Sequence, residues 1–253
     1  LLVHSKLFFY YHNQSIMCVA CLNGGFHQST ETDTNPLNLG TITEHVLEPE
    51  VVEPPKPWDK DCNTTVTDPL VNGLISETWG PWMKENWGFL DDNKVDFYVD
   101  LSIPKKQRRY TRRMIRKIDR VTNTKMQMQH DINLADVIVD DVDNYDKFGE
   151  QFSQANGLAY NEGDKIYATW LTSWNETNTN RRGKERVSYY NRRLITHEIL
   201  HTLGLSHPFG DGANPDYTNR DTAMSYNFLD WGIKNPLMPA DVYALQEIWG
   251  GVC

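Results

Sequence analysis

The sequence of 253 residues contains no run of about 18 or more apolar residues, so we expect no transmembrane helix. It also lacks an excess of positive charge. The 25 Lys and Arg residues face 34 Asp and Glu residues, and the net charge of −9 argues against nucleic acid as a partner. No internal repeat appears. With 39% hydrophobic residues, a chain of this length can bury one core and is typical of a globular protein.

Cysteine is scarce, with four residues in the chain. Cys18 and Cys21 have C-x-x-C spacing, which without a second such pair is a weak sign of metal binding or redox chemistry. Cys62 and Cys253 stand at the two ends of the region expected to fold. In an exported protein, a disulfide between Cys62 and Cys253 would link the two ends of the domain. The alternative is two unpaired thiols.

The first 58 residues differ from the rest of the chain in composition. Residues 7–22 are apolar in two pieces, and we interpret residues 1–22 as the remnant of an export or lipoprotein signal, with Cys21 as the lipidated residue in the second case. Residues 23–58 are polar and then acidic and proline-rich, as in a tether or a short pro-segment. These features predict a secreted or cell-surface protein whose folded domain covers residues 59–253.

Hydrophobic periodicity predicts the elements of that domain. Alternating Val95, Phe97 and Val99 predict a half-buried strand. Pro104 opens a predicted helix that reaches about Val121 and buries a stripe of apolar residues. Further strands are expected at 126–130, which includes the lone His130, and at 135–139 and 165–170, and further helices at 188–203 and from Pro239. Strands alternating with long helices in this order indicate an α+β domain.

Nine basic residues occupy the other faces of the helix that follows Pro104. Such a run is usually a solvated helix face, and a docking patch for an acidic partner is the alternative. The nine are Lys105, Lys106, Arg108, Arg109, Arg112, Arg113, Arg116, Lys117 and Arg120.

The most informative stretch reads H-E-I-L-H-T-L-G-L-S-H-P and begins at His197. His197 and His201 are four residues apart, which on a helix places both imidazoles on one face. Glu198 would lie beside a shared metal ion, where a carboxylate can take a proton from water. Gly204 can end the helix in a left-handed turn, so that the chain reverses and His207 supplies a third nitrogen. Three protein ligands and one open position define a catalytic zinc site.

The spacing is more specific than the short H-E-x-x-H pattern because it fixes five positions. The competing interpretation is a helix whose histidines are ordinary surface or core residues. A methionine turn further along the chain, Thr222-Ala223-Met224-Ser225-Tyr226, favours the metal site. The sequence therefore predicts one catalytic zinc ion, whereas no motif supports a calcium site.

These residues resemble the serralysin-like branch of the metzincin zinc proteases. The resemblance rests on Pro208 directly after the third histidine, on Met224-Ser225-Tyr226, and on Leu194-Ile195-Thr196 ahead of the zinc helix. Gly157-Leu158-Ala159-Tyr160 resembles the edge strand on which metzincins lay their substrate. The similarity covers roughly residues 75–250. The chain departs from the pattern at Leu200, where serralysins usually have glycine, and the sequence shows no glycine-rich calcium-binding repeats.

The resemblance implies a metzincin-type fold, with a twisted, mostly parallel sheet, an antiparallel edge strand, two long backing helices and a small C-terminal subdomain with a final helix. It implies a secreted, monomeric endopeptidase that acts on proteins or peptides, with Glu198 as general base. Tyr226 would assist at the transition state, and Met224 would pack beneath the three imidazoles. The substrate would pair with the main chain of Leu158, Ala159 and Tyr160.

Two other functions are open to a chain with this site. One is a catalytically silent zinc-binding module for surface adhesion, and the other is a zinc hydrolase that acts on something other than protein. Glu198 argues against the silent module, because such a module needs no base. Only the edge strand argues against the second alternative.

Overall fold

The computed structural model describes residues 68–75, 94–175, 177–179, 183, 185–229 and 235–251. The predictions for residues 1–22 and 23–58 lie outside these residues, as do all four cysteines and the expected Cys62–Cys253 disulfide. Among the helices of the described ranges, none is long and apolar enough to cross a membrane.

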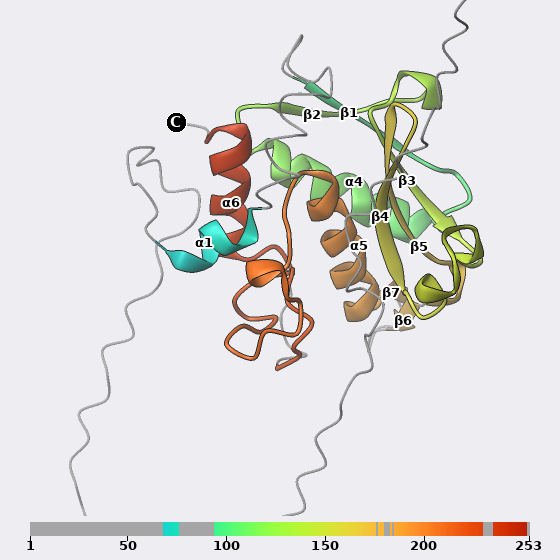
Figure 1. Cartoon of the computed structure of the whole chain (residues 1–253). Coiled ribbons are helices and arrows are strands. Elements are labelled where there is room, and N and C mark those ends of the chain that lie inside the picture. The colour runs from blue at the N-terminus through green and yellow to red at the C-terminus, as the bar shows by residue number, and fades with distance from the viewer. Residues whose placement is uncertain are drawn as a thin grey trace, which may run out of the picture.

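A five-stranded sheet in the order β2-β1-β3-β5-β4 forms one side of the domain (Figure 1). Its strands are β1 (Lys94–Val99), β2 (Lys125–Met128), β3 (Val137–Val142), β4 (Gly157–Glu162) and β5 (Lys165–Leu171). All neighbours are parallel except β4, which pairs antiparallel with β5 and ends that side of the sheet. The predicted α+β class, with a mostly parallel sheet and an antiparallel edge strand, is confirmed.

The second strand is shorter than its hydrophobic pattern suggested. β2 ends at Met128, and His130 lies in an exposed bend rather than in a strand. The chain turns away because the Asp131 carboxylate accepts a hydrogen bond from the N–H of Asn133 at 2.9 Å and caps a short 3-10 turn. The prediction that His130 belongs to the strand is therefore wrong.

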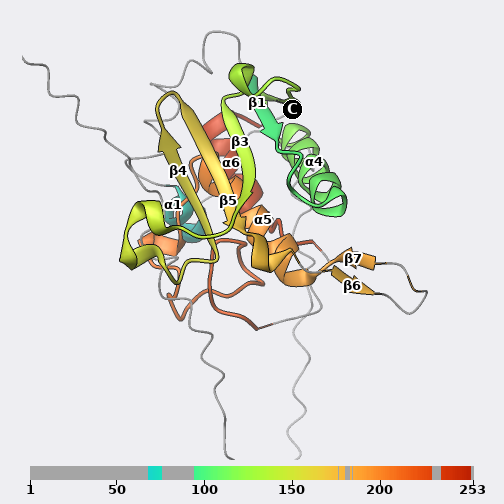
Figure 2. The same ribbon diagram turned by 90° about the vertical axis from the view of Figure 1, so that its right-hand side faces the viewer.

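Two helices cover one face of the sheet (Figure 2). These are α4 (Lys105–Asp119), which follows Pro104 as predicted, and α5 (Tyr189–Thr202). The side chain of Ser188 accepts from the N–H of Asn191 at 3.1 Å and so caps the start of α5. A hydrogen bond of 2.9 Å between the Tyr110 and Thr196 hydroxyls joins the two helices.

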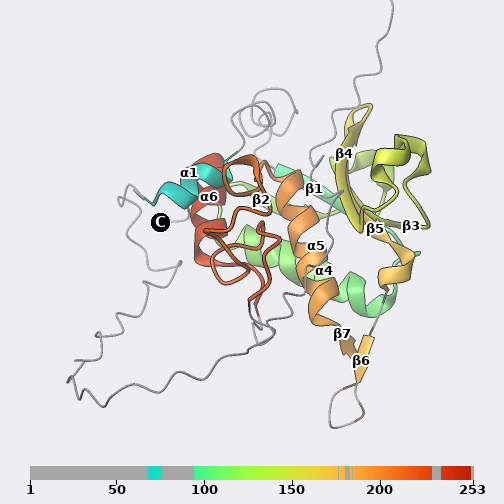
Figure 3. The same ribbon diagram turned by 60° about the horizontal axis from the view of Figure 1, so that its bottom comes forward.

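The basic residues of α4 are all at least partly exposed, and none of the nine is buried. Lys106 pairs with Glu185 in β7 (Glu185–Val187). With β6 (Thr177–Thr179), β7 forms a small antiparallel hairpin that extends beyond the N-terminal end of α5 (Figure 3). This exposure agrees with the interpretation of a solvated helix face.

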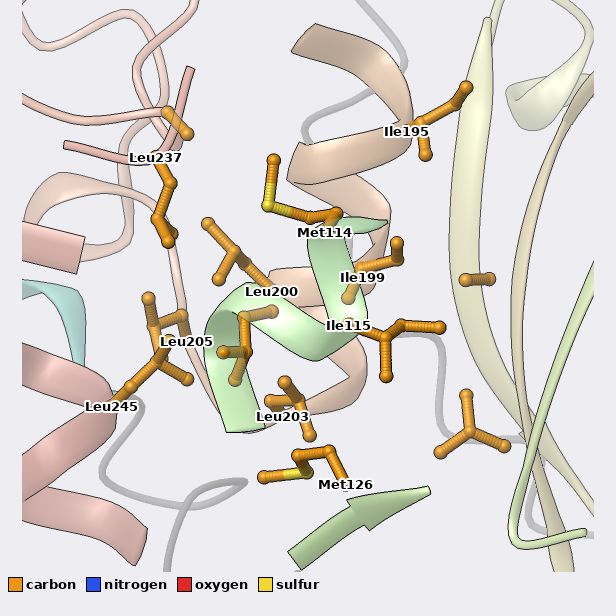
Figure 4. Close-up of a cluster of buried hydrophobic side chains, with 14 of the residues drawn as sticks. Met114, Ile115, Met126, Ile195, Ile199, Leu200, Leu203, Leu205, Leu237 and Leu245 are labelled. Carbon is orange, nitrogen blue, oxygen red and sulfur yellow. The ribbon is translucent and has the colours of Figure 1, made fainter. Parts of the chain in front are cut away.

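The third part of the domain is built from α1 (Pro69–Leu74), the loops after α5, and α6 (Pro239–Trp249). Pro239 opens the final helix as the sequence predicted, and α1 packs against it (Figure 1). The main hydrophobic cluster runs through all parts of the domain (Figure 4). It joins Met114 and Ile115 of α4 to Ile199 of α5 and Leu245 of α6.

Leu200 occupies the centre of this cluster and is fully buried, together with Leu205, Leu237 and Leu245 (Figure 4). It is placed between the two histidines of α5 in the sequence, but its side chain belongs to the core that holds α6 against α5. Leu200, the residue at which the sequence departs from the serralysin pattern, therefore contributes to the packing of the hydrophobic core.

We expect Leu200→Ala to lower the free energy of unfolding by about 2–5 kcal/mol, because it removes buried methyl groups and leaves a cavity. Urea unfolding followed by circular dichroism measures the change. Leu134→Ala is the matched control, because that leucine is 63% exposed and its truncation should change stability by less than about 0.5 kcal/mol. Equal effects of the two substitutions would contradict the packing role.

Candidate metal centre

The site begins in the last turns of α5, which present His197 and His201 on one face. The helix ends at Thr202, and the N–H of Leu205 bonds back to the carbonyl of Leu200 at 3.1 Å. Gly204 has a φ of 95°, a left-handed conformation that glycine adopts at little cost. The chain reverses there and brings His207 back beside the helix, as the sequence predicted.

The three histidines are buried and their Nε2 atoms converge. His197 Nε2 lies 3.1 Å from His201 Nε2 and 3.3 Å from His207 Nε2. A tetrahedral zinc ion with nitrogen ligands at about 2.0–2.1 Å holds those ligands about 3.3–3.4 Å apart. The spacing therefore fits ligands of one shared ion, and this buried triad could hold a metal such as zinc.

Two backbone carbonyls orient the imidazoles. His197 Nδ1 donates to the carbonyl of Ala223 at 2.9 Å, and His201 Nδ1 donates to that of Leu205 at 2.8 Å. A proton held on Nδ1 leaves the lone pair on Nε2, where a metal would bind. Burial lowers the pKa of all three histidines, that of His201 to about 4, so each is neutral at pH 7. Neutral imidazole is the form that ligates metals.

Glu198 is fully buried, and neither of its carboxylate oxygens has a hydrogen-bond partner among the described residues. Burial raises the pKa of this carboxyl group well above its usual value. An orphaned buried carboxylate is costly in an ordinary core, and it is explained if a cation and water complete its surroundings. Glu198 therefore supports the same assignment as the three histidines.

The start of β4 lies directly against Glu198. A methyl group placed on Gly157 would come within 2.4 Å of Glu198 Oε1 and 2.7 Å of Leu194 Cδ1. Only glycine leaves room for the carboxylate in its observed position. The sequence places Gly157 in the edge strand, but a glycine at the start of a strand does not reveal which side chain it will meet.

The edge strand carries the three residues predicted to bind substrate, and all three side chains are buried. The N–H of Leu171 donates a hydrogen bond to the carbonyl of Asn156 at 3.0 Å. In an antiparallel pair every second residue directs its N–H and C=O groups to the partner strand, so Leu158 and Tyr160 also direct theirs towards β5. The backbones of Gly157, Ala159 and Asn161 then face the free edge. Of the three predicted residues, only Ala159 has its main chain in position to pair with another strand.

Tyr226 stands next to the third histidine, with its hydroxyl 2.7 Å from His207 Nε2. Its ring packs over Gly212, where a methyl group would lie 2.4 Å from the ring. Pro208 follows His207 and is buried at the start of the 3-10 turn η6 (Pro208–Gly210). The structure thus brings the predicted Tyr226 into contact with the histidine cluster.

The methionine turn is held by Asp241, a residue that the sequence analysis missed. The buried Asp241 carboxylate accepts from the Thr222 hydroxyl, from the N–H of Ala223 at 3.0 Å and from the N–H of Met238 at 2.8 Å. Burial raises its pKa to about 6. Met224, which follows Ala223, is fully buried in the main cluster. An acidic residue in the first turn after Pro239 was the available signal, because that position often caps a helix.

We expect Asp241→Ala to lower the free energy of unfolding by about 2–4 kcal/mol, because three buried donors lose their acceptor. It should also weaken zinc affinity by about 10- to 100-fold, since Asp241 accepts from the N–H of Ala223, the residue whose carbonyl orients His197. Chemical denaturation and competitive zinc titration measure the two effects. Glu247→Ala, at an exposed acid of the same helix, is the control. An unchanged zinc affinity in Asp241→Ala would show that the position of the turn does not depend on the hydrogen bonds to Asp241.

The similarity of the chain to known proteins provides no further guide to this site. No protein-family model matches the sequence, and no curated protein matches it. The function of the chain therefore has to be derived from the chemistry of its own residues.

Proposed function

We propose that the chain is a zinc-dependent endopeptidase of the metzincin type, in the serralysin-like branch. One observation carries the proposal. Three buried imidazoles bring their Nε2 atoms together, and the buried carboxylate that follows the first of them has no hydrogen-bond partner among the described residues. An order of ligand, base and ligand on one helix is the arrangement that metal-assisted peptide hydrolysis requires.

His197, His201 and His207 are the residues that would hold the ion, which leaves a fourth position open for substrate. A bound zinc ion supplies Lewis acidity, which polarises the peptide carbonyl and lowers the pKa of water.

Glu198 moves the proton. Its carboxylate takes a proton from the attacking water as the water oxygen bonds to the carbonyl carbon. It then passes that proton to the amide nitrogen as the carbon–nitrogen bond breaks. The absence of a hydrogen-bond partner among the described residues supports this role, because the two carboxylate oxygens are free for water and the leaving amine.

Tyr226 and β4 would position the substrate. The Tyr226 hydroxyl, next to His207, is placed to donate a hydrogen bond to the carbonyl oxygen as negative charge develops there. The free edge of β4 offers the backbone of Ala159 for pairing with an extended peptide. This edge favours a peptide substrate over a non-protein one.

The silent zinc-binding module is less well supported. A buried Glu198 that has no partner in the described part of the chain destabilises the fold, and Gly157 leaves the space that its carboxylate occupies. A module that only binds zinc gains nothing from that cost. We further propose secretion or surface exposure, on the composition of residues 1–22, and a monomeric enzyme.

The principal test compares wild type with Glu198→Ala on casein and on a quenched-fluorescence peptide library. Wild type should bind one zinc ion per chain and cleave, and a chelator should abolish cleavage. Glu198→Ala should still bind zinc but lose activity by about 10²- to 10⁴-fold, the range that general-base catalysis contributes. Zinc content is measured by atomic emission. A wild-type protein that binds zinc yet cleaves nothing, both as the full chain and without residues 1–58, would favour the silent module.

Gly157→Ala tests the position of the base separately. The added methyl group should displace the Glu198 carboxylate and lower kcat by about 10- to 100-fold, while zinc affinity and thermal stability change little because the displaced atoms end a side chain. Gly251→Ala is the matched control, because a methyl group there meets no atom closer than 3.5 Å. A Gly157→Ala protein with wild-type kcat would mean that the carboxylate has room to act elsewhere.

A further inference from the structure

Arg193 lies on α5 one helical turn before His197, and therefore on the face that carries the histidines. Its guanidinium carbon lies 5.7 Å from the centre of the Phe228 ring. Phe228 in turn stacks on Tyr190 with ring centres 5.6 Å apart and meets Tyr189 edge-on at 5.6 Å. These three rings form an aromatic wall beside the guanidinium.

Burial raises the pKa of the Tyr226 phenol, and the nearby positive charge of Arg193 acts in the opposite direction, so the two side chains lie close to each other. Tyr226 contacts His207, while Glu198 faces Gly157 of β4. The histidine cluster is therefore flanked by the base on the β4 side and by the guanidinium on the side of residues 226–228. A peptide that crosses the cluster would place a side chain near Arg193.

Among the described residues, the guanidinium of Arg193 forms no ion pair. Its Nε and Nη2 atoms are shielded from solvent and form no hydrogen bond within the described ranges. The ion pairs found there involve other residues. Asp241 is the acidic group that acts on Arg193, but its oxygens already accept from Thr222, Ala223 and Met238. Burial lowers the pKa of Arg193, which is the expected consequence of a desolvated cation.

A buried guanidinium without a carboxylate is unfavourable, and an incoming anion would relieve that cost. We propose that Arg193 binds the carboxylate of an Asp or Glu side chain next to the cleaved bond, and so selects acidic substrates. This inference rests on the proposed peptidase function. The planar fork of a guanidinium matches a carboxylate through two parallel hydrogen bonds, and the aromatic wall excludes the water that would weaken them.

The test uses end-blocked peptides in pairs that differ only by Glu or Gln beside the cleaved bond, so that the side chain is the only carboxylate. A peptide library read by mass spectrometry first locates the preferred position. Wild type should prefer the Glu member by about 10- to 100-fold in kcat/KM, as for a hydrogen bond to a charged group. Arg193→Met should reduce the ratio to about one or below, and Arg193→Lys should retain part of it. Arg192→Met, at the neighbouring arginine, should keep the wild-type ratio.

A second measurement separates this inference from the peptidase proposal. The Kd values of the same pairs are measured with zinc-loaded Glu198→Ala protein, with and without Arg193→Met. A preference for Glu that depends on Arg193 supports the anion site even if wild type cleaves nothing. Cleavage without an acidic preference overturns the inference and leaves the peptidase standing. A loss of thermal stability in Arg193→Met with unchanged selectivity would assign Arg193 a structural role beside Asp241. That result would also overturn the inference that Arg193 binds an acidic side chain of the substrate.

Discussion

The hydrogen bond from His197 Nδ1 to the carbonyl of Ala223 is the contact on which the rest of the site depends. It joins the helix that carries two histidines to a turn 26 residues further along the chain. Asp241 holds the turn by accepting a hydrogen bond from the N–H of Ala223, and the same carboxylate caps the start of α6. One connected group of hydrogen bonds thus sets the imidazole orientation, the turn and the start of the final helix, so a change at α6 should reach the three histidines.

The charged groups near the histidines are distributed unevenly. Glu198 is buried on one side and Arg193 is half-buried on the other, and each has polar atoms without a hydrogen-bond partner among the described residues. A stable core would pair or remove both groups, since buried uncompensated charge is costly. Their retention beside a buried histidine triad fits a site that is completed by a cation, by water and by an acidic substrate. The binding of these components would stabilise the folded state.

Local sequence patterns predicted the parts of the fold whose signals are local. Alternation at Val95, Phe97 and Val99 and the proline before α4 identified a strand and a helix, because side-chain period and backbone restriction act over a few residues. The end of β2 was misplaced, since capping by Asp131 competes with strand pairing. The sequence predicted the edge strand, but it did not predict which residues of β4 turn their backbone N–H and C=O groups away from the sheet. That choice depends on the register with β5.

The sequence by itself determined which three histidines come together. Spacing on a helix puts His197 and His201 on one face, and Gly204 permits the reversal that returns His207, so these relations follow from backbone geometry. Tertiary structure alone decided the partners that come from distant parts of the chain. Gly157 meets Glu198, Asp241 holds the turn before Met224, and Arg193 lies against Phe228. Such contacts depend on how the sheet, α5 and α6 pack together, and no pattern of neighbouring residues records that packing.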